Sequence, residues 1–102
     1  KGVLVSRHIG ATWPQFEAAV ARGSLVVAGV DARFLWDVKS ESPLSHSILV
    51  TGAEISKLSG EILGVYINDS WTYPPGAGRF VPIAQFRKTW EGMSRYFAEV
   101  PK

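Results

Sequence analysis

Three apolar runs in the middle of the chain predict a sheet. Residues 24–30 form a continuous run of small and β-branched residues, which is typical of a strand covered on both faces. Two further apolar runs, at 46–53 and 61–68, flank a polar turn at 54–60 that contains glycine. Because runs joined by so short a connection pair as antiparallel neighbours, the second and third strands should form a hairpin, and with the first strand before them we expect a three-stranded meander.

A helix is predicted before the first of these strands, over residues 13–23. Thr12 is suited to cap its first turn, a proline follows within that turn, and a glycine ends the run. Trp13, Phe16 and Val20 are spaced by three and four positions, so they would line one buried face.

The remaining segments complete an α+β pattern. Residues 81–90 indicate a second helix with a proline near its first position, and residues 96–100 a last strand. Residues 3–5 fit a strand or a packed arm, 31–44 a loop with room for one turn of helix or a rim packed on the sheet, and 70–78 an irregular loop. The predicted fold class is α+β, an antiparallel sheet with flanking helices.

Composition narrows the classes of function. A chain of 102 residues with 46% hydrophobic content fits one domain with a modest core. The net charge of +2 comes from scattered residues with no basic stripe, so we expect no nucleic-acid partner. The sequence has no cysteine, hence neither disulfides nor thiolate metal sites, and no apolar run long enough for a membrane span. No cofactor is expected.

The candidate chemistry lies where one predicted strand begins and the next ends. His46 opens the second strand, and Asn68 and Asp69 close the third. An antiparallel hairpin brings these two positions close together. A carboxylate that holds one ring nitrogen of a histidine lets the other accept a proton from a nucleophile, and Asp69 suits this role better than Asn68. The spacing by itself is common, and it favours a structural histidine that bonds Ser45 or a backbone carbonyl.

The amino-acid sequence around His46 and Asp69 resembles that of a known family. The strings His-Ser-Ile-Leu-Val-Thr-Gly from His46 and Val-Tyr-Ile-Asn-Asp-Ser-Trp from Val65 are similar to the second half of papain-like cysteine peptidases of the bacteriocin-processing type, which remove double-glycine leader peptides. The resemblance covers most of residues 12–92. It implies a papain-like C-terminal half with His46 as general base, Asp69 as the orienting acid, and a peptide or protein as substrate.

The chain departs from that family in two respects. The family's nucleophile is a cysteine at the start of a helix upstream of everything seen here, and Ser70 stands where proline is usual. Hydroxyl side chains are poor substitutes for the thiol. Ser45 and Ser47 flank His46 on its strand and so point to the opposite face, and Ser6 and Thr12 follow no nucleophile-elbow pattern. The resemblance therefore implies that the cysteine comes from an upstream segment of the same protein or from another chain.

Other candidate residues fit structural roles at least as well. Trp36 and Trp71 are suited to line a substrate cleft, or equally to pack at its rim. His8 with Asp31 or Asp37 has no spacing typical of zinc, so no metal site is expected. The Gly-Ala-Gly-Arg segment at 76–79 lacks the residues of a phosphate loop and fits a turn.

Three functions remain open from the sequence. The chain is the His/Asp portion of a cysteine peptidase or acyl-transfer enzyme, inactive alone; or a non-catalytic peptide-binding module of the same fold; or an unrelated α+β interaction domain. A start at Lys1 without methionine suggests a fragment of a longer protein, and a toxin or effector domain within a secreted bacterial protein would fit that context.

Overall fold

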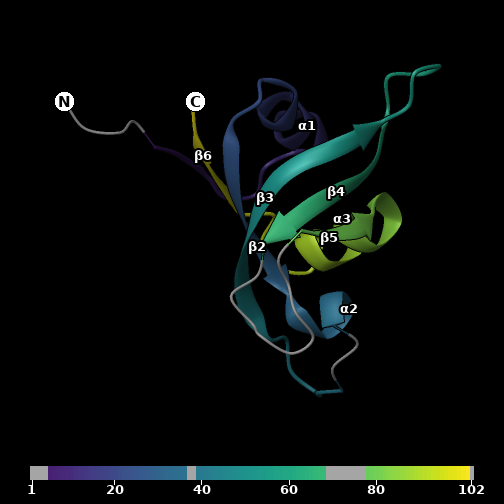
Figure 1. Cartoon of the computed structure of the whole chain (residues 1–102). Coiled ribbons are helices and arrows are strands. Elements are labelled where there is room, and N and C mark those ends of the chain that lie inside the picture. Colours follow the sequence, from purple (N-terminus) through teal and green to yellow (C-terminus); the bar gives the residue numbers. More distant parts are fainter. Residues whose placement is uncertain (1–4, 37–38, 69–77, 102) are drawn as a thin grey trace.

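The computed structural model describes residues 5–36, 39–68 and 78–101, which fold into six strands and three helices (Figure 1). In chain order these elements are β1 (Ser6–His8), α1 (Trp13–Ala21), β2 (Leu25–Asp31), α2 (Ala32–Trp36), β3 (Ser45–Ile55), β4 (Ile62–Asn68), β5 (Arg79–Pro82), α3 (Ile83–Glu91) and β6 (Phe97–Val100). No helix in these ranges is long and apolar enough to cross a membrane.

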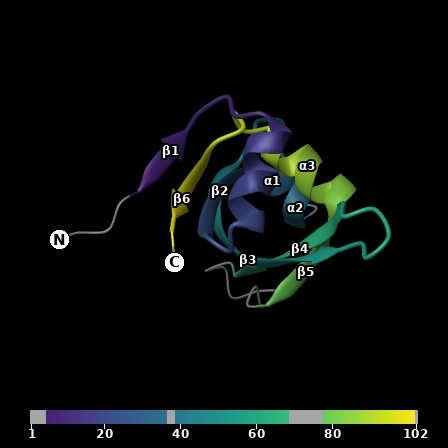
Figure 2. The same ribbon diagram turned by 90° about the horizontal axis from the view of Figure 1, so that it is seen from above.

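All six strands belong to one antiparallel sheet with the order β1-β6-β2-β3-β4-β5. The α+β class is confirmed, and so is the meander, which is β2-β3-β4. The last strand, β6, lies between β1 and β2, so the two ends of the chain meet in the sheet. Figure 2 shows the sheet curving around the helices, which lie on its concave side.

The strand predicted at residues 24–30 is covered by the described helices on one face only, so the expectation of coverage on both faces was wrong. Val26, Ala28 and Val30 are fully buried under the helices, whereas Leu25 and Val27 point to the other face and are half-buried. No described helix covers that second face. A run of apolar residues without polar alternation therefore did not require burial on both sides.

Helix α1 begins where the sequence indicates. The Thr12 hydroxyl accepts a hydrogen bond from the Gln15 backbone N–H, and the Gln15 side chain accepts one from the Thr12 N–H, which together form a capping box. At the other end Gly23 adopts a φ of +75°, a left-handed conformation that favours glycine after a helix. Arg22 lies just beyond the helix, with its guanidinium on the buried Glu99 carboxylate at 2.7 Å.

The second predicted helix begins later than the sequence suggested. Residues 79–82 form β5 at the edge of the sheet, with Val81 opposite Val65 and Phe80 opposite Tyr66. Helix α3 starts only at Ile83, so Pro82 closes a strand and precedes the helix instead of lying inside it. Proline suits an edge strand because it has no N–H to donate to a neighbour. At the N-terminus the strand is Ser6–His8, and residues 3 and 4 of the predicted arm lie outside the described residues.

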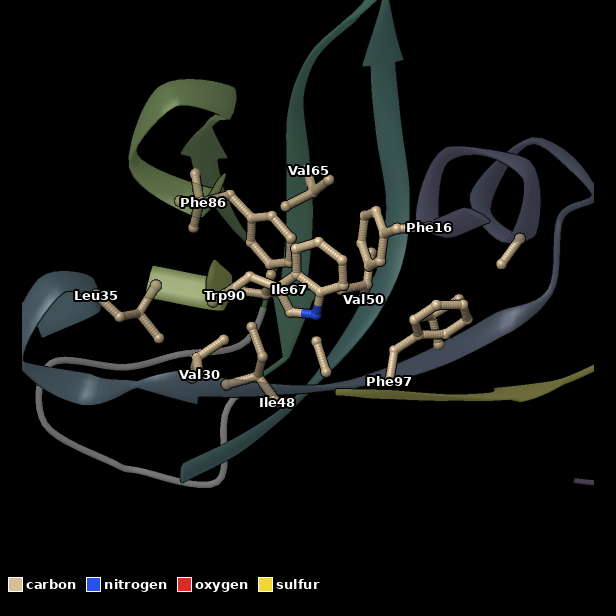
Figure 3. Packing of buried hydrophobic residues seen from close by; sticks show 14 of the residues in the cluster. Phe16, Val30, Leu35, Ile48, Val50, Val65, Ile67, Phe86, Trp90 and Phe97 are labelled. Carbon is tan, nitrogen blue, oxygen red and sulfur yellow. The ribbon is translucent and has the colours of Figure 1, made fainter. Parts of the chain in front are cut away.

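The core lies between the concave face of the sheet and helices α1 and α3 (Figure 3). Phe16 occupies its centre, with ring centroids 5.1 Å from Phe86, 5.2 Å from Trp90 and 5.7 Å from Phe97. The indole N–H of Trp90 donates to the Tyr96 carbonyl at 2.9 Å, which satisfies the one polar group of this fully buried side chain.

Candidate functional site

The candidate residues that the structure describes, His46, Asn68 and Trp36, lie at one end of the sheet, where β2 ends, β3 begins, β4 ends and β5 begins. This arrangement follows from the antiparallel meander, which places alternate strand ends together. Helix α2 follows β2 directly and lies at the same end (Figure 1). The loops and strand ends of the site therefore rest on a rigid sheet.

His46 is the second residue of β3 and is half-buried. Its backbone is opposite Val30 of β2. Since side chains alternate along a strand, His46 shares the helix-covered face with Ile48 and Val50, both of which are 2% exposed. The imidazole thus lies where the buried core opens toward solvent, an environment suited to a group that must exchange protons with a substrate.

Asp31 holds the start of β3 beside His46. Its carboxylate is fully buried and accepts hydrogen bonds from the backbone N–H groups of Arg33 and Leu44, at 3.1 and 3.2 Å. The Leu44 carbonyl in turn accepts from the Ala32 N–H at 2.8 Å. One side chain therefore fixes both ends of the 32–44 connection, and with it the position from which β3 and His46 start.

The charge of Asp31 is balanced by Arg33. Its guanidinium approaches the carboxylate with Nη2 2.8 Å from Oδ2 and Nε 3.1 Å from Oδ1. Arg33, with help from the two backbone N–H groups, lowers the pKa of the Asp31 carboxyl from 3.8 to about 2, against the opposing effect of burial. The Asp31 carbonyl also accepts a hydrogen bond from the buried Thr89 hydroxyl of α3. We assign Asp31 and Arg33 a positioning role.

Trp36 ends α2, and Arg79 begins β5 at the same end of the sheet. The guanidinium carbon of Arg79 lies 4.1 Å from the centroid of the Trp36 ring, a cation–π contact. Arg79 is opposite Ile67 of β4, a fully buried residue, so it emerges on the same face as His46. Trp36 and Arg79 therefore pack against each other on the side of β5, a contact that fits a cleft wall and rim packing alike.

Helix α2 is a single turn and depends on α3 for its position. The Gln85 side chain donates from Nε2 to the carbonyls of Phe34 and Leu35, at 3.1 and 3.2 Å. The Phe34 ring is also contacted by Arg33 and Lys88, whose charged groups lie 5.0 and 4.7 Å from its centroid. These contacts satisfy the open C-terminal carbonyls of α2 and hold Trp36 in place.

Asn68 is not placed to orient His46. It is opposite Leu49 of β3, and Leu49 points away from the face that carries His46. Its side-chain oxygen accepts a hydrogen bond from the Gly78 N–H at 2.8 Å. The alternative of Asn68 as the partner of the imidazole is therefore wrong, and its amide serves to link the end of β4 to the start of β5.

Of the other residues considered from the sequence, the structure describes Ser45, Ser47 and His8. Ser45 and Ser47 flank His46, are exposed, and point to the opposite face, as predicted. Asp69 and Trp71 lie outside the described residues, so their roles remain predictions. His8 stacks on Phe97 with a centroid distance of 4.4 Å. Among the described residues no three carboxylate or imidazole groups are clustered to hold a metal.

The roles of two residues at this end, Asp31 and Arg79, were not predicted from the sequence. Asp31 follows an apolar strand and precedes Arg33 by two positions, which is the signal of an acidic turn that caps and pairs locally. Arg79 carries no comparable signal, because its contact with Trp36 joins segments more than 40 positions apart.

Comparisons of the chain with protein-family models, with curated proteins and with solved structures found no match. The resemblance to papain-like peptidases thus rests on the residues themselves.

Proposed function

We propose that this chain supplies the proton-handling part of a papain-like cysteine peptidase or acyl-transfer site, with His46 as general base and Asp69 as the group that orients it. One observation supports this most: His46 is half-buried on the helix-covered face of β3, at a strand start held by the buried Asp31. The family resemblance of the surrounding residues adds the chemistry.

The nucleophile in this proposal is a cysteine on a segment outside the given sequence. The imidazole of His46 takes the proton from the thiol, and the thiolate attacks an amide carbonyl, which breaks the C–N bond and forms an acyl-enzyme. The imidazolium returns its proton to the departing amine. Water then hydrolyses the thioester, with His46 again accepting a proton, and Asp69 holds the ring throughout.

Trp36 and Arg79 take the substrate-facing role. Their stacked side chains offer a flat apolar surface with a positive edge on the side of β5. A peptide chain that passes the imidazole would lie against this surface. Trp71 is proposed as a second wall.

The test is to produce the chain together with the protein segment encoded immediately upstream and to measure alkylation by iodoacetamide at pH 6. A cysteine activated by His46 should react at least about tenfold faster than free cysteine, because more of it is thiolate at that pH. His46→Ala should remove the enhancement, and His8→Ala, the other histidine, should leave it intact. Equal rates for His46→Ala and the unaltered protein would show that His46 is not the base.

A peptide-binding module of the same fold is the second candidate, favoured by the absence of cysteine from the chain. In that case the upstream segment confers no fast-reacting thiol, and peptides bind without being cleaved. Binding that persists in His46→Ala, with no alkylation in any variant, would support the module over the enzyme.

A further inference from the structure

A groove lies at the opposite end of the sheet, between α1 and the turn that joins β3 to β4. It consists of two adjoining hollows of about 320 and 330 Å³ that share Glu17 and Ile62 in their linings. Ile55 follows His46 by nine positions along β3, a span of about 30 Å in an extended strand. The groove is therefore separate from the candidate catalytic end and does not rest on the proposed function.

The first hollow is apolar and is built by the outward face of α1. Pro14, Glu17, Ala18 and Ala21 are spaced by three, four and seven positions, so they line one side of the helix, away from the core-facing Phe16 and Ala19. The facing wall is formed by Ile55 with Gly60. Ala18 and Ala21 are small, and Ile55 on the facing wall is 48% exposed. The two walls therefore leave apolar surface open to solvent between them.

The second hollow is acidic at the point where it meets the first. Glu17 and Glu61 both line it, and neither forms an ion pair with any residue in the described ranges. The one cation in the lining, Arg87, is already engaged: its Nη2 lies 3.1 Å from Glu91, and its guanidinium carbon 4.7 Å from the Trp13 ring. The two hollows are thus lined by two carboxylates and one guanidinium, an excess of negative charge on a chain of net charge +2.

The turn beside the groove adds a second apolar contact. Residues 56–60 are held by hydrogen bonds from Ser56 N–H to the Glu61 carbonyl and from Gly60 N–H to the Ser56 carbonyl, at 2.8 and 2.9 Å. This turn projects beyond the rest of the sheet in Figure 1. Leu58 at its tip is fully exposed. An exposed leucine on an ordered turn is available to close over a bound chain.

We infer that this groove binds a short extended peptide segment in which a lysine or arginine neighbours a branched apolar residue. The apolar side chain would occupy the hollow between Ala18 and Ile55, and the cation would lie between Glu17 and Glu61. The face of α1 that lines the groove spans about 10 Å, the length of about three extended residues. Hollows of this size are at the lower end of the range for ligand sites, which favours side chains over a large cofactor.

The experiment measures binding of a blocked hexapeptide of alternating leucine and lysine to the ¹⁵N-labelled chain by NMR. The amide resonances of residues 14–21 and 55–62 should shift in one saturable process, and those near His46 should not. A hexapeptide of leucine and glutamate, and one of serine and lysine, should bind several-fold more weakly. Shifts spread over the whole surface, or equal binding of the leucine–glutamate peptide, would overturn the inference.

Charge variants make the test specific. Glu17→Gln and Glu61→Gln should each weaken binding of the leucine–lysine peptide about two- to fivefold, as expected for exposed ion pairs. Glu41→Gln, an exposed carboxylate near the other end of the sheet, is the matched control and should change nothing. The double variant Glu17→Lys with Glu61→Lys should reverse the preference toward the leucine–glutamate peptide. If it keeps the original preference while its circular dichroism spectrum shows a native fold, the groove is not the binding site.

Discussion

At the scale of single residues, Asp31 carries more of the candidate site's geometry than any residue the sequence singled out. Its carboxylate accepts hydrogen bonds from Arg33 and from the Leu44 N–H, and so connects the end of β2 to the residue just before β3, two positions from His46. The face of His46 was predictable, because alternation with Ile48 and Val50 fixes it. The hydrogen bond from the Leu44 N–H to the Asp31 carboxylate, here called the Asp31 clamp, was not predictable, because it joins residues 13 positions apart in the sequence.

Asp31→Asn should destabilise the fold by roughly 2 kcal/mol at pH 7. The pKa of the Asp31 carboxyl is depressed to about 2 in the folded state from an ordinary value of 3.8, so its stabilising effect is complete above pH 4 and is lost as the pH falls toward 2. Urea unfolding followed from pH 7 down to pH 2.5 should therefore show a deficit of the variant that is constant down to about pH 4 and shrinks below it. Glu41→Gln should track the unaltered chain throughout. A deficit that is constant with pH would contradict the proposed charge pairing.

At the scale of elements, the outer strand β5 depends on close packing with β4. Gly64 is opposite Pro82, and a Cβ at this glycine would lie 2.2 Å from the Phe80 ring and 2.7 Å from the Val81 carbonyl. Contacts that short cannot be relieved without displacing the β5 backbone. The glycine is therefore a condition for β5 to pair at all.

Gly64→Ala should cost about 2–3 kcal/mol in the free energy of unfolding, because the strands must separate to admit the methyl group. The matched control is Gly52→Ala on β3, where the nearest atom to the added Cβ is 4.0 Å away, in the Tyr66 ring. Amide hydrogen exchange should show loss of protection at residues 79–82 in the Gly64 variant alone. Equal stability of the two alanine variants would mean that β4 and β5 are less tightly paired than described.

Some helices and strands could be predicted from the sequence and others could not. Helix α1 and the meander β2-β3-β4 were predictable, because a capping residue, helical spacing and short apolar runs are local signals. Strand β5 was not, because its four residues pair through Tyr66 and Val65 and carry a proline that also suits a helix start. The place of β6 between β1 and β2 was equally hidden, since the pairing of distant chain segments leaves no local pattern.

At the scale of the whole molecule, the sheet separates two surfaces of different character. One end of the sheet carries His46, Trp36 and Arg79 next to Asp31. The other end carries the groove between α1 and the β3–β4 turn, where an apolar hollow adjoins one that is lined by two glutamates. The two proposals are independent, because β3 runs between them. Variants at Glu17 or Glu61 should leave the chemistry at His46 unchanged, and His46→Ala should leave the groove unchanged.

The central claim is that Asp69 orients the imidazole of His46, and the chain as given can test it. Long-range ¹H–¹⁵N NMR of the histidine rings distinguishes the two neutral tautomers. At pH 8 we expect His46 in a single tautomer, because a carboxylate on one ring nitrogen keeps the proton there. Asp69→Ala should restore the tautomer mixture of a free imidazole, whereas Asn68→Ala, whose residue is opposite Leu49 on the face of the sheet away from His46, should not. Unchanged His46 ring resonances in Asp69→Ala would contradict the claim.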